Sequence, residues 1–93
     1  MIKDVTFSRF AQNQLNKLPR YIVSKLKTWV EAVREDGLEK VRKTPGYHDE
    51  PLKGKRFGQR SIRLSQSYRA IYMICSNDEI EFVSIEEVNK HDY

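Results

Sequence analysis

The chain has 93 residues with a formal net charge of +4, and its 39% of hydrophobic residues is enough to exclude a disordered chain. A chain of this length builds one domain around one modest core, so we expect residues 1–93 to form a single domain. It has no apolar run near the ~20 residues of a membrane span and no signal-peptide core at its start, which favours a cytoplasmic protein. The single cysteine, Cys75, excludes an internal disulfide, and its apolar neighbours predict a core position.

The first half of the sequence predicts a strand followed by helices. Residues 2–7 are typical of a short strand, and Ser8 is a suitable N-cap for the helix that follows. Apolar residues at helical spacing then predict two helices separated at Pro19, which together make a helical hairpin. Gly37 is expected to end the second helix, and a third short helix is expected at residues 38–43.

The second half predicts a meander of strands. After a Pro-Gly turn, residues 47–58 have the composition of a polar loop with little regular structure. Three strand-like runs follow, joined by connections of hairpin length, at residues 60–65, 68–75 and 80–88. We therefore predict an α+β fold in the order β-α-α-(α)-β-β-β: a small antiparallel sheet with the helical hairpin on one face and the first strand at an edge.

One segment supplies the whole positive charge of the chain. Residues 51–77 contain no acidic residue and six basic ones, which leaves 11 of the 17 basic and all 13 acidic residues elsewhere, a net charge of −2. Such a block is typical of a surface that binds a polyanion, and arginine matches phosphate geometry well. The alternative is an ordinary solvated surface. The six residues are Lys53, Lys55, Arg56, Arg60, Arg63 and Arg69.

Groups that exchange protons are concentrated at residues 90–93, directly after the last predicted strand. Neither these residues nor residues 48–50 have the spacing of a zinc or calcium site, and residues 54–58 lack the ending of a phosphate-binding P-loop. We therefore expect no metal and no cofactor.

The remaining candidate groups are the basic residues of the predicted sheet, a carboxylate in the loop, and side chains at the C-terminus that can exchange protons. RNA cleavage needs groups of these kinds. The 2′-hydroxyl attacks the adjacent phosphorus while a base takes its proton, an acid protonates the leaving oxygen, and cations offset the developing charge. Taken singly, Glu50 and His91 are more often solvated surface residues, and only their combination with the basic block favours catalysis. Tyr68 and Tyr72 share one parity of a strand, so we expect them to pack in the core or stack on a base.

Four short segments form the most specific pattern in the chain. They are Glu50-Pro51-Leu52-Lys53-Gly54, Ser61-Ile62-Arg63-Leu64, Tyr68-Arg69-Ala70-Ile71-Tyr72 and the terminal His91-Asp92-Tyr93. Together with the predicted order of elements, these segments resemble the RelE/ParE superfamily of type II toxin–antitoxin toxins.

The resemblance implies an endoribonuclease of the RelE-like branch, which cleaves mRNA in the ribosomal A site. It implies a general base at Glu50, and acid/base or base-stacking roles at His91 and Tyr93. Some relatives end in a Tyr-His-Tyr-like order, so the division of acid and base roles among Glu50, His91 and Tyr93 stays open. The predicted catalytic residues are Glu50, Arg69, His91 and Tyr93, and the predicted RNA-binding residues are Lys53, Lys55, Arg56, Arg60 and Arg63.

The resemblance also implies partners. They are a cognate antitoxin, bound near the basic face or across the helices, together with mRNA and the ribosome with its 16S RNA. No membrane and no small-molecule cofactor is expected. Two alternatives remain open: a ParE-like inhibitor of DNA gyrase, which needs no acid/base pair, and a small basic nucleic-acid-binding domain with salt-sensitive affinity and no catalysis.

Overall fold

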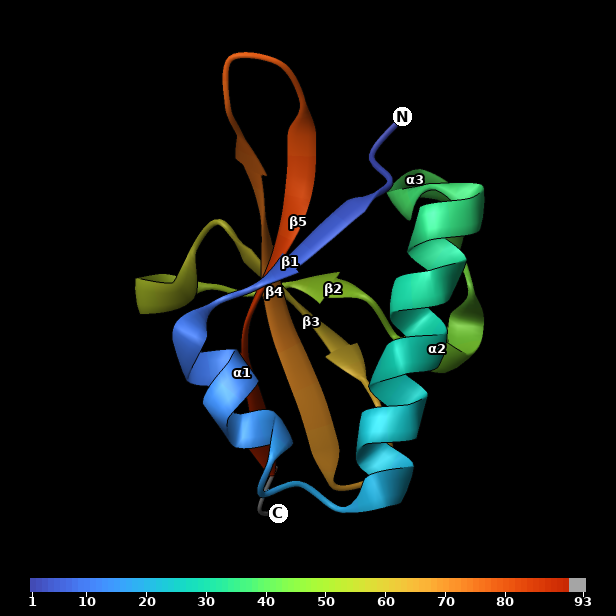
Figure 1. The fold of residues 1–93 in the computed structure, drawn as a ribbon, viewed down its shortest axis with the longest axis vertical. Coiled ribbons are helices and arrows are strands. Elements are labelled where there is room, and N and C mark those ends of the chain that lie inside the picture. The colour runs from blue at the N-terminus through green and yellow to red at the C-terminus, as the bar shows by residue number, and fades with distance from the viewer. Residues whose placement is uncertain (91–93) are drawn as a thin grey trace.

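The structure of the protein, a computed structural model, describes residues 1–90 and confirms the predicted α+β class (Figure 1). The helices and strands follow the expected order, with one additional short strand. They are β1 (Asp4–Phe7), α1 (Arg9–Leu15), α2 (Arg20–Asp36), α3 (Leu38–Val41), β2 (Glu50–Pro51), β3 (Gln59–Arg63), β4 (Tyr68–Ser76) and β5 (Glu81–Lys90). Two single 3₁₀ turns, η1 (Pro45–Tyr47) and η2 (Gly54–Arg56), flank β2.

The strands form one sheet in the order β1-β5-β4-β3-β2. The predicted meander of β3, β4 and β5 is antiparallel, and β1 lies at an edge as expected. The expectation of a wholly antiparallel sheet is wrong, because β1 pairs with β5 in parallel, with Val5 opposite Val83. A sequence pattern identifies a strand but does not give its direction beside a partner that is distant in the chain.

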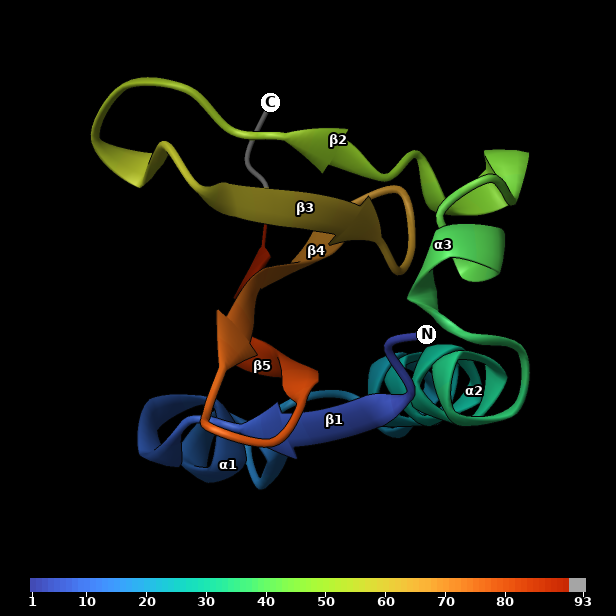
Figure 2. The ribbon, with the colours of Figure 1, turned by 90° about the horizontal axis from the view of Figure 1, so that it is seen from above.

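The two faces of the sheet differ. One face packs against α2 and α3, as Figure 2 shows, and we call it the core face and its opposite the open face. Because side chains alternate along a strand, Ala70 and Tyr72 of β4 point to the core face, whereas Arg69 and Ile71 point to the open face.

A bulge in β5 decides which residues of that strand lie on each face. Ile85 and Val88 are both buried on the core face although they are three residues apart. Glu86 is the extra residue between them in the pairing with β4. Glu87 and Asn89 consequently lie on the open face.

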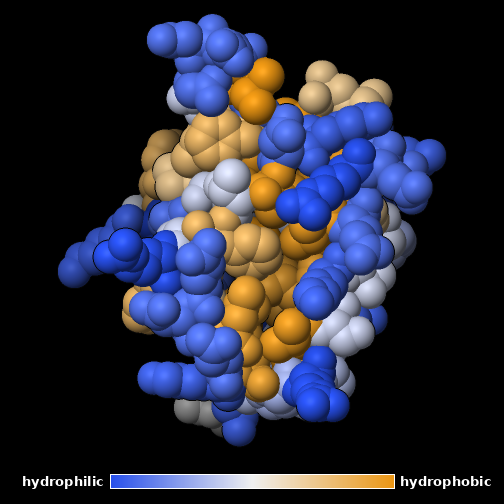
Figure 3. Space-filling model, in the orientation of Figure 1, coloured by the Kyte–Doolittle hydropathy of each residue, from blue (hydrophilic) through white to orange (hydrophobic). Residues whose placement is uncertain are grey.

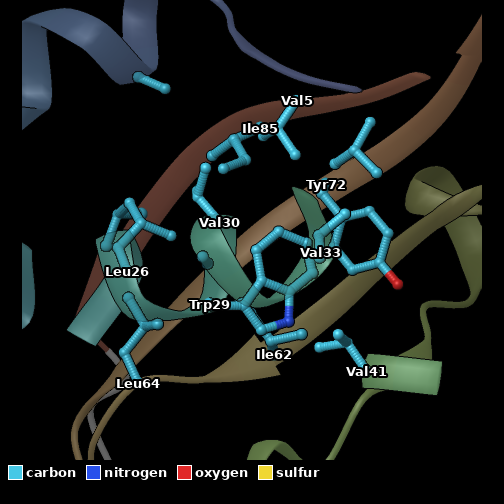
Figure 4. Packing of buried hydrophobic residues seen from close by; sticks show 14 of the residues in the cluster. Val5, Leu26, Trp29, Val30, Val33, Val41, Ile62, Leu64, Tyr72 and Ile85 are labelled. Carbon is cyan, nitrogen blue, oxygen red and sulfur yellow. The ribbon is translucent and has the colours of Figure 1, made fainter. Parts of the chain in front are cut away.

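Helix α2 buries one stripe against the core face, which confirms the predicted helix and its core role. Trp29 is fully buried and contacts the ring of Tyr72, with ring centroids 5.2 Å apart (Figure 4). The buried stripe consists of Ile22, Leu26, Trp29, Val30 and Val33.

Two expectations need correction, and one alternative is decided. Tyr72 is fully buried and Tyr68 is partly buried against the core, so of the two alternatives core packing holds for Tyr72. Cys75 is not a core residue; it is partly exposed because the alternation of β4 turns it away from the core. The segment at residues 47–58 is not all loop, because Glu50–Pro51 pairs with β3 as a fifth strand.

Helix α1 lies along the edge of β5 beyond the end of β1. It begins at the predicted N-cap, where the Ser8 hydroxyl accepts the Ala11 N–H at 3.0 Å. The Gln14 side chain exchanges two hydrogen bonds with the Val88 backbone, at 2.8 and 2.7 Å, and so occupies the place of a strand partner.

An apolar groove of about 280 Å³ separates α1 from α2. It is part of the apolar strip between hydrophilic side chains on this face of the molecule (Figure 3). The groove is lined by Phe7, Leu15, Val23, Leu26 and Val30, with Lys27, Glu31 and Arg34 at its margins.

Gly37 ends α2 as predicted, and its conformation requires glycine. Its φ is +88° and its ψ 150°, a region that other residues rarely adopt, and an added Cβ would lie 2.7 Å from Met1 Cγ. We expect Gly37→Ala to lower the free energy of unfolding by about 1–3 kcal/mol in urea denaturation. Gly46→Ala is the matched control, since nothing lies within 4 Å of its added Cβ; equal losses in both variants would contradict the prediction.

Candidate functional site

A hollow of about 360 Å³ on the open face gathers residues from four strands and the loop after β2. Strand pairing places three of its lining residues side by side. Glu50 of β2 pairs with Ser61 of β3, and Ser61 pairs with Ile71 of β4. The hollow is lined by Glu50, Leu52, Arg56, Ser61, Arg69, Ile71 and Asn89.

Two of the four predicted catalytic residues meet in this hollow. Arg69 Nη1 lies 3.5 Å from Glu50 Oε1 and donates a hydrogen bond of 3.0 Å to Ser61 Oγ. The Arg69 side chain is 20% exposed and that of Glu50 60%, so the cation is held by the sheet while the carboxylate faces solvent. Ser61 was not predicted as a site residue, although its place two residues before Arg63 on the same strand puts it on the same face as Arg63.

Arg63 lies directly opposite Arg69 in the ladder between β3 and β4. Two like charges in this position repel each other. The Nε of Arg63 is also buried, with no hydrogen-bond partner among the described residues, which leaves a donor unsatisfied. An anion between the two guanidinium groups would relieve their repulsion.

Of the remaining basic residues of the loop, Arg56 lines the hollow. Arg56 forms an ion pair with Glu87 of β5, and its Nη1 donates to Gln59 Oε1 at 2.9 Å. Lys53 and Lys55 are exposed at the η2 turn and form no ion pair within the described part of the chain.

Arg60 does not lie on the open face with Arg63, the other predicted RNA-binding residue of the sheet. It pairs with Tyr72 and therefore points to the core side of the sheet, away from Arg63. Its Nε lies 2.6 Å from Oδ1 of Asp49, whose side chain has no solvent exposure. Partial burial lowers the pKa of Arg60, but the hydrogen bond with Asp49 and the charge of that carboxylate outweigh burial, and the pKa is raised above its ordinary value.

Tyr72 is the second partner of Asp49. Its hydroxyl donates to Asp49 Oδ2 at 2.5 Å. Burial raises the pKa of Tyr72 well above its ordinary value, and the hydrogen bond with Asp49 and its negative charge raise it further, so the phenol stays protonated. Sequence reasoning missed Asp49, because an aspartate in a polar loop has no feature that predicts burial.

The other two predicted catalytic residues, His91 and Tyr93, lie outside the described residues. The last residues that the structure describes are Asn89, which pairs with Arg69 and lines the hollow, and Lys90, which pairs with Tyr68.

Two findings concern other classes of site. Among residues 1–90, no three or more histidine, cysteine, aspartate and glutamate side chains gather as they would around a metal ion. In the same range, no helix has the length and apolar character needed to cross a membrane.

No protein-family model matches the sequence, and no curated protein matches it. Solved structures do match in fold. YafQ from Escherichia coli strain BL21(DE3) is 18% identical, with a TM-score of 0.72 over 95% of this chain and 92% of that chain. YoeB from Staphylococcus aureus, described as a dimer, is 20% identical, with a TM-score of 0.68 over 100% of both chains.

A third match comes from a toxin–antitoxin complex, RelBE2 of Mycobacterium tuberculosis, which is 25% identical with a TM-score of 0.60 over 98% of this chain and 100% of that chain. These proteins are similar to this chain over nearly its whole length. The chain has the fold of the RelE/ParE toxin superfamily.

Proposed function

We propose that the protein is the toxin of a type II toxin–antitoxin system and acts as an endoribonuclease on mRNA in the ribosomal A site. The observation that carries this proposal is the convergence of Glu50 and Arg69 in one solvent-open hollow, with Arg63 beside them. A carboxylate and two cations in this arrangement meet the needs of an attack by a 2′-hydroxyl on phosphorus.

In this proposal Glu50 is the general base. Its carboxylate is exposed enough to reach a substrate hydroxyl, and it accepts the proton of the attacking 2′-hydroxyl. His91 or Tyr93 donates the proton that the departing 5′-oxygen needs. The bond from phosphorus to the 5′-oxygen breaks as the bond to the 2′-oxygen forms.

Arg63 and Arg69 stabilise the charge on the phosphoryl oxygens. Ser61 holds Arg69 through its hydroxyl, so that cation is oriented before the substrate arrives. A phosphate between the two arginines replaces their repulsion with two attractive contacts.

The basic loop extends the binding surface beyond the reacting phosphate. Lys53 and Lys55 are exposed at the η2 turn, where they can meet the backbones of mRNA and 16S RNA. Arg56 and Arg60 already have carboxylate partners, so we expect each to contribute less to RNA affinity than the two lysines.

The antitoxin is proposed to occupy the groove between α1 and α2. Its apolar lining is of the kind that receives an apolar helix or strand, and the charged residues at its margins can set the register of such a segment. The matched structures of RelBE2, of DinJ-YafQ from E. coli and of YoeB-YefM from S. aureus are described as toxin–antitoxin complexes, which supports a protein partner here.

Phosphate binding can be measured without a substrate. We expect phosphate to raise the free energy of unfolding, by about 1.4 kcal/mol at ten times its Kd, and Arg63→Gln to remove this effect because one of the two cations is lost. Thermal unfolding in phosphate and in chloride of equal ionic strength provides the measurement. Lys17→Gln, an exposed site distant in sequence from the hollow, is the control; an equal loss in that variant would point to general charge screening.

Cleavage is tested by adding the purified protein to ribosomes translating a defined mRNA, with naked mRNA alongside, and mapping 5′ ends by primer extension. We expect cuts at A-site codons that need the ribosome. Glu50→Gln should slow cleavage roughly 10²- to 10⁴-fold by removing the base. Arg69→Ala should cost about 10²- to 10³-fold, and His91→Ala/Tyr93→Ala should abolish cleavage.

Lys17→Gln serves as the control in this assay too. If mRNA stays intact under every condition, the nuclease proposal fails. Inhibition of purified gyrase at stoichiometric concentration would then favour the ParE-like alternative, and salt-sensitive RNA binding alone would favour a binding domain.

The antitoxin groove is tested in cells. Expression of the protein should arrest growth, and a genomic library of the source organism should yield a fragment that restores it. Val23→Glu should still arrest growth but escape this rescue, because a buried unpaired carboxylate weakens binding by on the order of 100-fold. Thr28→Glu places the same charge on an exposed part of α2 and should be rescued; rescue of both variants would exclude this groove.

A further inference from the structure

Asp49 directly precedes Glu50 in the loop, and its carboxylate is buried whereas that of Glu50 is exposed. Its side chain has no solvent exposure, and both of its oxygens accept hydrogen bonds, Oδ1 from Arg60 at 2.6 Å and Oδ2 from Tyr72 at 2.5 Å. A buried charge persists only where such partners compensate for the lost water. The bonds therefore hold this point of the loop against the sheet.

The partners of Asp49 are themselves fixed. Tyr72 has no exposed surface and contacts Trp29 of α2, and Figure 4 shows its hydroxyl directed out of the aromatic cluster. Arg60 belongs to β3 and pairs with Tyr72 in the ladder. Asp49 is thus attached to β3 through Arg60 and to β4 through Tyr72, and Tyr72 cannot move without disturbing the core.

The strand that carries Glu50 is very short. Strand β2 contains only Glu50 and Pro51, which pair with Ser61 and Arg60 of β3. His48, just before Asp49, has a φ of +46°, a left-handed conformation that is uncommon outside glycine. The nearest backbone bond after the strand is the Leu52 N–H to the Gln59 carbonyl, at 2.9 Å.

The direction of the Asp49 side chain fixes the direction of the Glu50 side chain, because the two residues are consecutive. Consecutive side chains of an extended segment point to opposite faces. When Asp49 is held on the core side, Glu50 must point to the open face, where it meets Arg69 at 3.5 Å. We propose that Asp49 is a positioning residue that fixes the Glu50 carboxylate beside Arg69, a role that rests on the proposed function of Glu50 as general base.

In this proposal Arg60 and Tyr72 also help to position the Glu50 carboxylate. Neither touches the hollow, and each acts on Glu50 only through Asp49. The three side chains connect the aromatic core with the open face.

The first measurement is a mutant cycle in the translating-ribosome assay. Asp49→Ala should lower the single-turnover cleavage rate at saturating ribosomes by on the order of 100-fold, with little change in KM, because Arg63 and Arg69, the cations proposed to bind the reacting phosphate, are untouched. The loss should nearly vanish in a Glu50→Gln background. Asp49→Asn keeps an acceptor for Arg60 and should recover part of the rate. Asp78→Ala removes an exposed carboxylate from the β4–β5 turn and should cleave at the normal rate.

The second measurement does not depend on activity. Hydrogen exchange of the Leu52 amide should accelerate by about tenfold in Asp49→Ala and stay unchanged in Asp78→Ala, because the loop loses its attachment only in the first variant. Unchanged Leu52 exchange, or an equal loss of rate in the wild-type and Glu50→Gln backgrounds, would overturn the positioning role. If the unmodified protein cleaves no mRNA, the nuclease proposal fails by itself, and Leu52 exchange alone decides whether Asp49 positions Glu50.

Discussion

Trp29 of α2 and Tyr72 of β4 lie in contact at the centre of the core, with ring centroids 5.2 Å apart and no exposed surface on either side chain. An aromatic pair of this kind contributes about 0.5–1.5 kcal/mol beyond the burial of its area. The position of the pair matters more for the structure than this energy, because the Tyr72 side chain ends in a polar hydroxyl group. The ring belongs to the core while the hydroxyl reaches Asp49 at the margin of the sheet. Helix α2, the sheet and the loop that carries Glu50 are therefore joined through the Tyr72 side chain.

The sheet separates two surfaces of different character. Its open face carries the hollow with Glu50, Ser61 and Arg69, and on its helix side the molecule has the apolar groove between α1 and α2. The bulge at Glu86 contributes to this separation, since it returns Val88 to the core and sends Asn89 to the hollow. A strand with regular alternation after Ile85 would have reversed the two.

The charge of the basic segment is partly neutralised in the folded protein. Three of its six basic residues have carboxylate partners from outside the segment: Arg56 with Glu87, Arg60 with Asp49, and Arg69 with Glu50. The charge count along the sequence therefore overstates the field that an approaching polyanion meets. What remains is concentrated at the lysines of the η2 turn and at Arg63.

Local chemistry determined much of the architecture from the sequence by itself. The cap at Ser8, the glycine at the end of α2, the apolar stripe with Trp29 and the hairpin meander depend on neighbours within a few residues, and all are present. The sequence motifs grouped Glu50 and Arg69 as candidate site residues through a family resemblance, and their contact is a finding of the structure. Only the tertiary structure decided the parallel direction of β1, the register shift in β5, the exposure of Cys75 and the pairing of Arg60 with Asp49. These features depend on contacts between segments far apart in the chain, and one residue of register is enough to move a side chain from one face of a sheet to the other.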